Sequence, residues 1–186
     1  TAGEKVSMVG NIGYSFAKQV ALNPTEWYVV EVSSFQLDDV NSFRPDISIL
    51  LNITPDHLDR YDYKMEHYIA AKFRIAEYQQ KEDLLIVNMD DETIKTYLDK
   101  HQLKPKIARI SMNENNIIQE DGAFMKDEEL QFRYNGEESN LSIHDLTIKG
   151  KHNLYNSMAA GISALAADIR KEKFRDCFST RSSNGP

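Results

Sequence analysis

Near-continuous apolar runs of strand length recur through the first 111 residues, and each is followed by a polar turn and a segment with helical periodicity. Such runs are typical of parallel strands buried on both faces, because helices cover the two sides of a parallel sheet. The pattern predicts an α/β fold with a mostly parallel sheet flanked by helices. The predicted strands are residues 5–9, 26–32, 46–53, 83–88 and 106–111, and the predicted helices are residues 14–22, 36–42, 64–80 and 91–101.

The sequence changes in character after residue 111. Short alternating segments are separated by Asp121-Gly122 and Asn135-Gly136, dipeptides that favour hairpin turns. They predict a small antiparallel sheet appended to the parallel one, at about residues 112–148. The alanine-rich segment "NLYNSMAAGISALAADI" that follows has apolar residues on most faces and predicts a buried helix.

Length and charge limit the classes of protein that this chain can belong to. Its 186 residues, 41% of them hydrophobic, are enough for one sizeable core, which we place at residues 1–178 with a disordered or non-native tail at 179–186. A net charge of -7 argues against nucleic acid as a partner. No apolar run is long enough to span a membrane and no signal peptide is visible, so we expect a cytoplasmic protein without a membrane partner. The single cysteine, Cys177, cannot form an internal disulfide.

Three consecutive predicted strands end in polar residues, at the edge where ligands bind to open parallel sheets. After the first strand, "VGNIGY" places Asn11 between Gly10 and Gly13. Glycine permits close approach of the backbone to a phosphate, and asparagine offers a donor and an acceptor. A plain tight turn is the alternative interpretation.

Glu31 lies near the carboxyl end of the second predicted strand, "EWYVVEV". A buried carboxylate requires a metal ion, an arginine or several hydroxyl donors, because an unpaired charge is costly to remove from water. The alternative is an edge strand in which Glu31 faces water. The segment does not distinguish the two.

The third predicted strand runs into Thr54-Pro55-Asp56-His57, which has the form of a helix N-cap followed by proline. His57 is then expected in the first helical turn, where it could bind a metal ion or substrate or simply lie at the surface. Lys72 shares the apolar face of the next predicted helix with Tyr68 and Ile69. Its amine either extends outward to solvent or is held inward, where desolvation would lower its pKa and expose a reactive amine.

The segment "GKHNLYN" places His152, Asn153 and Asn156 at the start of the predicted buried helix. Asn153 and Asn156 are three residues apart and share a helical face. Their amides suit a planar ring such as a nucleobase. Helix capping by Asn153 is an alternative that leaves Asn156 unexplained.

Six motifs taken in order resemble the central ATPase domain of the Mur ligases over about residues 8–170: "GNIG", "EVSSFQL", "LNITPDHLDRY", "AAKFRI", "VNMDD" and "GKHNLYN". Within that family, "SSFQL" after the strand glutamate is similar to the branch that adds D-glutamate. The resemblance implies an ATP-dependent ligase of peptidoglycan precursor synthesis. Its implied partners are UDP-N-acetylmuramoyl-L-alanine and D-glutamate, which are joined through an acyl phosphate.

The resemblance also implies a role for each matching residue. Glu31 would ligate the magnesium ion that bridges the ATP phosphates. His57 would bind a second magnesium ion near the acyl phosphate, and Lys72, carbamylated, would help to hold it. Two further sets are implied: Asn11, Ser33 and Gln36, with His57 near them, for the muramoyl substrate, and His152, Asn153 and Asn156 for the nucleotide.

One departure from the family pattern is plain, since no GxxxxGK[ST] phosphate-binding sequence is present. We therefore expect a central-domain fragment of a monomeric enzyme, without the N-terminal and C-terminal domains and inactive by itself. Two alternatives are a non-catalytic α/β nucleotide-binding module and another Mur-type amide ligase. A third is a metal-dependent hydrolase that uses Asp56, His57 and Asp59, although acidic residues also suit the first turn of a helix.

Overall fold

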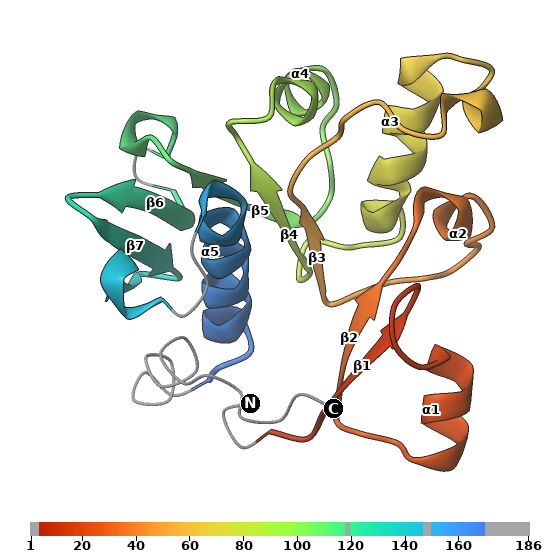
Figure 1. Ribbon diagram of the computed structural model, residues 1–186, viewed down its shortest axis with the longest axis horizontal. Helices are drawn as coiled ribbons and strands as arrows, with labels where there is room; N and C mark the ends of the chain where they lie inside the picture. Colours follow the sequence, from red (N-terminus) through yellow and green to blue (C-terminus); the bar gives the residue numbers. More distant parts are fainter. Residues whose placement is uncertain (1–3, 118–119, 147–149, 170–186) are drawn as a thin grey trace.

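The computed structural model describes residues 4–117, 120–146 and 150–169, and its strands form two sheets (Figure 1). β1 (Val6–Gly10) and β2 (Trp27–Glu31) make a two-stranded parallel sheet. The second sheet has six strands in the order β3-β4-β5-β6-β7-β8. These strands are β3 (Ile47–Leu50), β4 (Leu84–Asn88), β5 (Lys106–Ser111), β6 (Gly122–Lys126), β7 (Glu129–Tyr134) and β8 (Glu137–Ser142).

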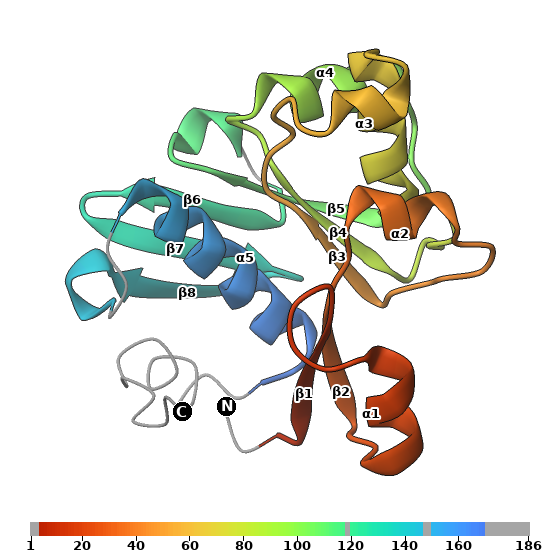
Figure 2. The same cartoon turned by 45° about the vertical axis from the view of Figure 1, so that its right-hand side comes forward.

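Helices cover both faces of the six-stranded sheet (Figure 2). The α-helices are α1 (Phe16–Leu22), α2 (Ser34–Asp38), α3 (Met65–Phe73), α4 (Glu92–Lys100) and α5 (Lys151–Ala166). Four short 3₁₀ helices are η1 (Leu58–Tyr61), η2 (Arg74–Ala76), η3 (Glu114–Asn116) and η4 (Ile143–Asp145). Helix α5 packs on one face, whereas α3 and α4 pack on the other. No helix in the described ranges is both long and apolar enough to cross a membrane.

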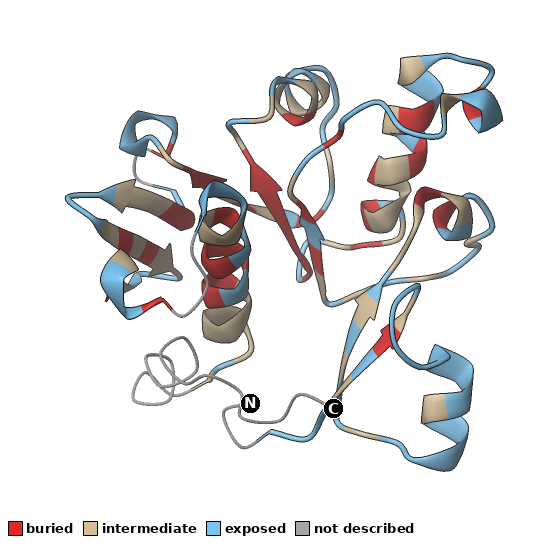
Figure 3. Ribbon diagram, in the orientation of Figure 1, coloured by how far each residue is buried: buried red, intermediate tan, exposed pale blue. Residues whose placement is uncertain are grey.

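Strand β4 is the centre of the core, and all five of its residues are buried (Figure 3). Alternate side chains point to opposite faces of a strand. Leu84 and Ile86 therefore pack with the residues of α5, while Leu85 and Val87 pack with those of α3 and α4. The apolar run at 83–88 reflects this burial on both faces, as the sequence predicts.

The predicted fold class is confirmed, because the structure is α/β and four of its six strand pairings are parallel. The prediction of an appended antiparallel sheet needs a correction. The strands β6, β7 and β8 pair antiparallel with one another as predicted, but they belong to the same sheet as β3, β4 and β5, because β6 pairs parallel with β5. The sheet is also divided elsewhere: across the described residues, β1 and β2 pair with each other and not with the other six strands.

Only one of the two predicted hairpin turns is correct. Asn135-Gly136 joins β7 to β8, with positive φ at both residues. Asp121-Gly122 instead leads into β6, and the turn between β6 and β7 is Asp127-Glu128. Gly122 lies against the strand that carries Arg109, where an added Cβ would overlap the carbonyl oxygen of Arg109. The glycine therefore serves close strand pairing rather than a turn.

Helices α2 and α3 differ most from their predicted bounds. Helix α2 begins two residues earlier than predicted because Ser33 and Gln36 form a capping box at its start. Helix α3 ends at Phe73 and continues as η2 only to Ala76, so the predicted helix at 64–80 is too long. Beyond the helix, the fully buried Gln79 donates to the carbonyl oxygens of Pro45 and Leu84.

The pairing of Arg44 with Asp83 predicts a pH-dependent stability. Arg44 donates two hydrogen bonds to Asp83, at 2.6 and 3.1 Å, and these lower the pKa of the Asp83 carboxyl. A carboxyl with a depressed folded-state pKa contributes stability above its unfolded pKa of about 4, and that contribution is lost as the pH falls through the folded value. We expect Asp83→Asn to destabilise the chain at pH 7, and the deficit to shrink at pH 3.

Denaturant unfolding of both proteins at the two pH values measures this effect. Glu82→Gln is the matched control, because Glu82 lies 3.8 Å from the same arginine but is largely exposed. An exposed ion pair contributes little, so this control is expected to change stability by less than about 1 kcal/mol. An Asp83→Asn deficit of equal size at both pH values would contradict the assignment.

Candidate functional site

The carboxyl ends of β3, β4 and β5 lie at one edge of the six-stranded sheet, because these strands are parallel neighbours. The loops after β3 and β4 begin at this edge. In open α/β sheets this edge is where ligands bind. The predicted site residues can therefore be followed strand by strand.

Asn11 and Glu31 come together at the carboxyl ends of β1 and β2. Gly10 is the strand partner of Glu31. The Asn11 backbone N–H donates to the Glu31 carbonyl oxygen at 2.8 Å, and the Asn11 amide nitrogen lies 3.4 Å from a Glu31 carboxylate oxygen. Glu31 is exposed on a strand with one partner, as the edge-strand alternative predicts. Its carboxylate is thus accessible to a cation.

The close contact between the backbones of residues 10 and 31 explains why residue 10 is glycine. Gly10 has φ of 111°, and an added Cβ would overlap the carbonyl oxygen of Glu31. Only glycine combines that backbone conformation with such close approach. The loop places the Asn11 side chain beside the carboxylate that ends β2.

Ser33 and Gln36 lie at the start of α2, just after Glu31. Ser33 Oγ accepts a hydrogen bond from the Gln36 backbone N–H at 3.3 Å, and Gln36 Oε1 accepts one from the Ser33 backbone N–H at 2.9 Å. This reciprocal capping box explains both residue types without a ligand. Gln36 is nonetheless exposed, so its amide remains accessible from solvent.

His57 lies in the loop after β3, but it is not in the first turn of an α-helix as predicted. It is the N-cap residue of η1 and has a left-handed backbone with φ of 49°. Two further left-handed residues, Asp62 and Tyr63, follow η1, and α3 begins only at Met65. Successive left-handed residues prevent an α-helix from forming directly after β3.

An aromatic series connects His57 with Lys72. The Phe35 ring lies 5.3 Å from the His57 ring and 6.3 Å from the Tyr61 ring, between ring centres. Tyr61 contacts Tyr68 at 5.3 Å, and Lys72 Nζ lies 5.3 Å from the centre of the Tyr68 ring. Lys72 is partly buried, with its amine held by an aromatic face. The structure therefore brings His57 and Lys72 to the two ends of one packed group of rings.

The donor groups of the described residues show how far a metal site is already assembled. In the described part of the chain, no three His, Cys, Asp or Glu side chains gather as a metal-binding group. Asp56 and His57 lie 3.5 Å apart, and Asp59 does not join them in such a group. This gives the hydrolase alternative no support. Glu31 and His57 are exposed and chemically suited to a cation, while Lys72 would become an oxygen ligand only as a carbamate.

The nucleotide candidates lie in the first turns of α5, which the sequence predicts correctly as a helix. Gly150 is the N-cap, so the capping alternative for Asn153 is wrong. Asn156 and His152 are exposed, and the Asn156 amide nitrogen lies 3.3 Å from Asn153 Oδ1. The two amides thus share a helical face, as their spacing predicts.

Residues that the sequence reasoning assigned no role lie between these groups. Asn88, at the end of β4, donates to the Leu51 carbonyl oxygen at 2.9 Å and so ties β4 to the segment after β3. Asp91 caps α4 through the Ile94 N–H at 2.9 Å and also accepts the Ile53 N–H at 3.0 Å. Both residues belong to the motif "VNMDD". Aspartate is a favoured N-cap residue, so the role of Asp91 at the start of α4 could have been predicted from the sequence.

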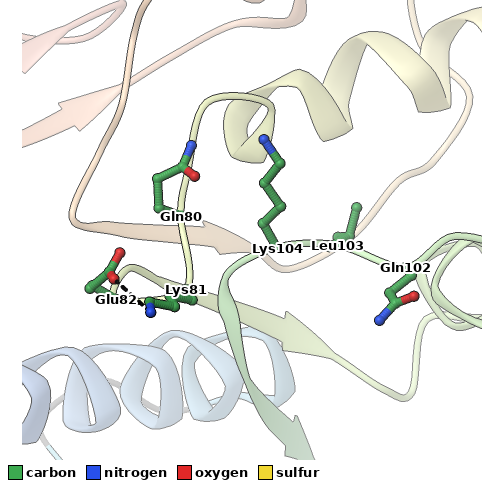
Figure 4. Close-up of a pocket in the computed structure, with 6 residues that line it drawn as sticks. All are labelled: Gln80, Lys81, Glu82, Gln102, Leu103 and Lys104. Atoms are coloured by element: carbon green, nitrogen blue, oxygen red, sulfur yellow. Dashed lines mark ion pairs between the residues drawn. The ribbon is translucent and has the colours of Figure 1, made fainter.

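One surface hollow lies away from all of these residues. It measures about 500 Å³ and is lined by residues that precede β4 and β5, at the amino ends of these strands: Gln80, Lys81, Glu82, Gln102, Leu103 and Lys104 (Figure 4). A second hollow of about 430 Å³ lies over α3, near Arg60 and Arg74. Strand-end chemistry, rather than hollow size, therefore identifies the candidate site.

The two sheets and their helices make an α/β domain, with an amide and a carboxylate at the ends of β1 and β2 and an imidazole in the loop after β3. The family model described as "Mur ligase middle domain" matches residues 4–164. The chain belongs to this family.

Relatives with close sequence similarity carry one functional name. A protein of Bacteroides fragilis named UDP-N-acetylmuramoylalanine–D-glutamate ligase is 47% identical over 181 residues, which is 96% of this chain and 39% of the relative. A protein of the same name from Christiangramia forsetii is 44% identical over 178 residues, again 96% of this chain and 39% of the relative. The chain therefore spans about two fifths of the length of these curated relatives.

Solved structures agree on the fold. MurF ligase from Thermotoga maritima in complex with ADP has a TM-score of 0.63 and 14% identity, over 98% of this chain and 43% of that one. The UDP-N-acetylmuramate:L-alanyl-gamma-D-glutamyl-meso-diaminopimelate ligase from Neisseria meningitides has a TM-score of 0.63 and 14% identity, over 88% of this chain and 51% of that one. At this identity the likeness concerns the fold alone.

Proposed function

We propose that residues 1–178 are the central domain of a ligase that uses ATP to join D-glutamate to UDP-N-acetylmuramoyl-L-alanine. The observation that carries the proposal is the 47% identity, over 96% of the chain, to a relative named for this reaction. The placement of Glu31, His57 and Asn156 at strand ends or a helix start supports it. The complete protein is proposed to be a cytoplasmic monomer.

Magnesium and ATP are the proposed cofactors. Glu31, His57 and Lys72 would hold magnesium, Lys72 after its amine adds to carbon dioxide, loses a proton and becomes an anionic carbamate. Bound magnesium would neutralise the negative charge that carboxylate and phosphate groups bring together. A free ammonium at Lys72 would instead repel such cations.

The remaining side chains are proposed to position the two substrates. Asn11 and Ser33 would donate to the muramoyl substrate, with Gln36 beside them. Asn153 and Asn156 would hydrogen-bond the nucleotide, Asn156 toward adenine and His152 adjacent. Orientation of the reacting groups lowers the barrier because it converts a bimolecular encounter into a reaction within one complex.

Phosphate release by the full-length protein tests the proposal. With ATP, magnesium and UDP-N-acetylmuramoyl-L-alanine present, release should depend on D-glutamate and should fall to background when L-lysine, meso-diaminopimelate or D-alanyl-D-alanine replaces it. Turnover with one of those amines instead would assign the chain to another amide ligase. Residues 1–186 alone are expected to release no phosphate under the same conditions, and release dependent on both substrates would refute their inactivity.

A further inference from the structure

The two adjacent carboxylates of the "VNMDD" motif hold opposite sides of the candidate site. Asp91 holds the segment at Ile53, which leads to His57, through the backbone hydrogen bond described above. Asp90 points to the other side and contacts the ends of β5 and α5. No role in the proposed reaction accounts for Asp90.

Asp90 accepts four hydrogen bonds with its two carboxylate oxygens. The donors are Ser111 Oγ, the Met112 backbone N–H at 2.7 Å, the Asn116 amide nitrogen at 3.1 Å and the Tyr155 hydroxyl at 2.7 Å. Burial alone would raise the pKa of Asp90, but these four donors together lower it. Asp90 is therefore an ionised acceptor that joins β4, β5, η3 and α5.

Tyr155 is the only one of the four donors on α5, and in the sequence it lies between two of the nucleotide candidates, Asn153 and Asn156. Its side chain is buried in the core cluster beneath α5. Desolvation and the hydrogen bond to Asp90 raise the pKa of the Tyr155 phenol well above its ordinary value, so it remains a donor. The hydroxyl thus fixes the first turns of α5 against the end of β4.

We propose that Asp90 and Tyr155 form a positioning pair for the nucleotide site, in which Tyr155 holds the α5 turn that presents Asn153 and Asn156. The inference rests on the proposed nucleotide site. Asp90 and Tyr155 do not contact the nucleotide in this scheme; they fix where the two amides lie. A site held within a fraction of an ångström depends on such supporting groups.

Tyr155→Phe in the full-length protein tests the pair, because it removes the hydroxyl and keeps the buried ring. The control is Tyr28→Phe, since Tyr28 is a partly buried tyrosine whose hydroxyl also makes a hydrogen bond, accepting from the Thr25 backbone N–H at 2.9 Å, and it has no role in the proposed site. We expect Tyr155→Phe to raise the Kd for ADP roughly tenfold, the effect of losing about one hydrogen bond to a charged group. Calorimetric titration with ADP measures this value, and the control should leave it unchanged.

Steady-state kinetics separates positioning from general destabilisation. Tyr155→Phe should raise KM for ATP while leaving KM for UDP-N-acetylmuramoyl-L-alanine unchanged, whereas lost folding would lower the active fraction for both substrates. Equal ADP affinity in Tyr155→Phe and the parent protein would overturn the pair. Equal effects of Tyr155→Phe and Tyr28→Phe would also overturn it, because they would indicate stability alone.

Asn156→Ala distinguishes failure of the pair from failure of the nucleotide site. If this change weakens ADP binding and Tyr155→Phe does not, the nucleotide site stands and the positioning pair is wrong. If neither the parent protein nor Asn156→Ala gives a nucleotide-dependent signal, the proposed nucleotide site is wrong and the pair is wrong with it. Weakening by both substitutions supports both inferences.

Discussion

Replacing Lys72 with alanine in the full-length protein is expected to reduce ligase turnover by about three orders of magnitude or more. The proposed carbamate would supply an anionic oxygen ligand that alanine cannot replace. Phosphate release with all substrates present measures the loss. Added bicarbonate should not restore activity, because the variant has no amine to modify, whereas a small carboxylate such as acetate should restore part of it.

A lysine away from the candidate site provides the control. Lys81 lies at the amino end of β4 and is almost fully exposed, so Lys81→Ala should retain turnover within about twofold of the parent protein. Near-normal turnover in Lys72→Ala would overturn the assignment of Lys72. Rescue by bicarbonate would also count against it.

Replacing Gly10 with alanine is expected to destabilise the protein by about 3 kcal/mol or more. The added methyl would lie only 2.2 Å from the Glu31 carbonyl oxygen, in a backbone conformation that residues other than glycine rarely adopt. Relief of the overlap requires β1 and β2 to separate where Asn11 meets Glu31. Denaturant unfolding of the chain measures the loss of stability.

Gly136→Ala separates backbone strain from overlap. Gly136 also has a positive φ, 78°, but nothing lies within 4 Å of the position that its Cβ would take. Gly136→Ala should therefore lower the free energy of unfolding only by the backbone strain of a non-glycine residue at positive φ, about 1 to 2 kcal/mol. If Gly10→Ala and Gly136→Ala lose the same stability, the overlap with the Glu31 carbonyl oxygen does not contribute to the loss.

Local chemistry made much of this fold predictable. The run at 83–88 is apolar at successive positions because β4 is buried on both faces, and the structure places β4 at Leu84–Asn88. The positions of β1, β2 and β5 agree with their predicted bounds to within one residue at each end. These signals depend on neighbouring residues, so a single sequence contains them.

Long-range pairing was not predictable in the same way. Nothing near β6 indicates that its partner is β5, because the contact joins Gly122 to Arg109 across a loop. Nor does the sequence near β2 and β3 indicate that these two strands belong to different sheets. The early start of α2 was readable, since Ser33 and Gln36 have capping-box spacing.

In the candidate site, too, the residues marked by their local sequence were predicted, and those defined by long-range contacts were not. Strand-end position identified Asn11, Glu31 and His57 because each comes at or just after an apolar run. Asp90 and Tyr155 are 65 residues apart in the sequence, and their hydrogen bond appears only after β4 and α5 have packed. Supporting residues of this kind require the tertiary structure.

The break between the two sheets has a mechanical consequence for the ligand site. The strands β1 and β2, whose carboxyl ends hold Asn11 and Glu31, share no backbone ladder with the larger sheet among the described residues, so α2 and the segment after it connect the two sheets. Arg74 donates to two carbonyl oxygens there, those of Asp38 and Val40. Such contacts yield more readily than a strand ladder. We therefore expect the separation of Glu31 and His57 to vary more readily than distances within the six-stranded sheet.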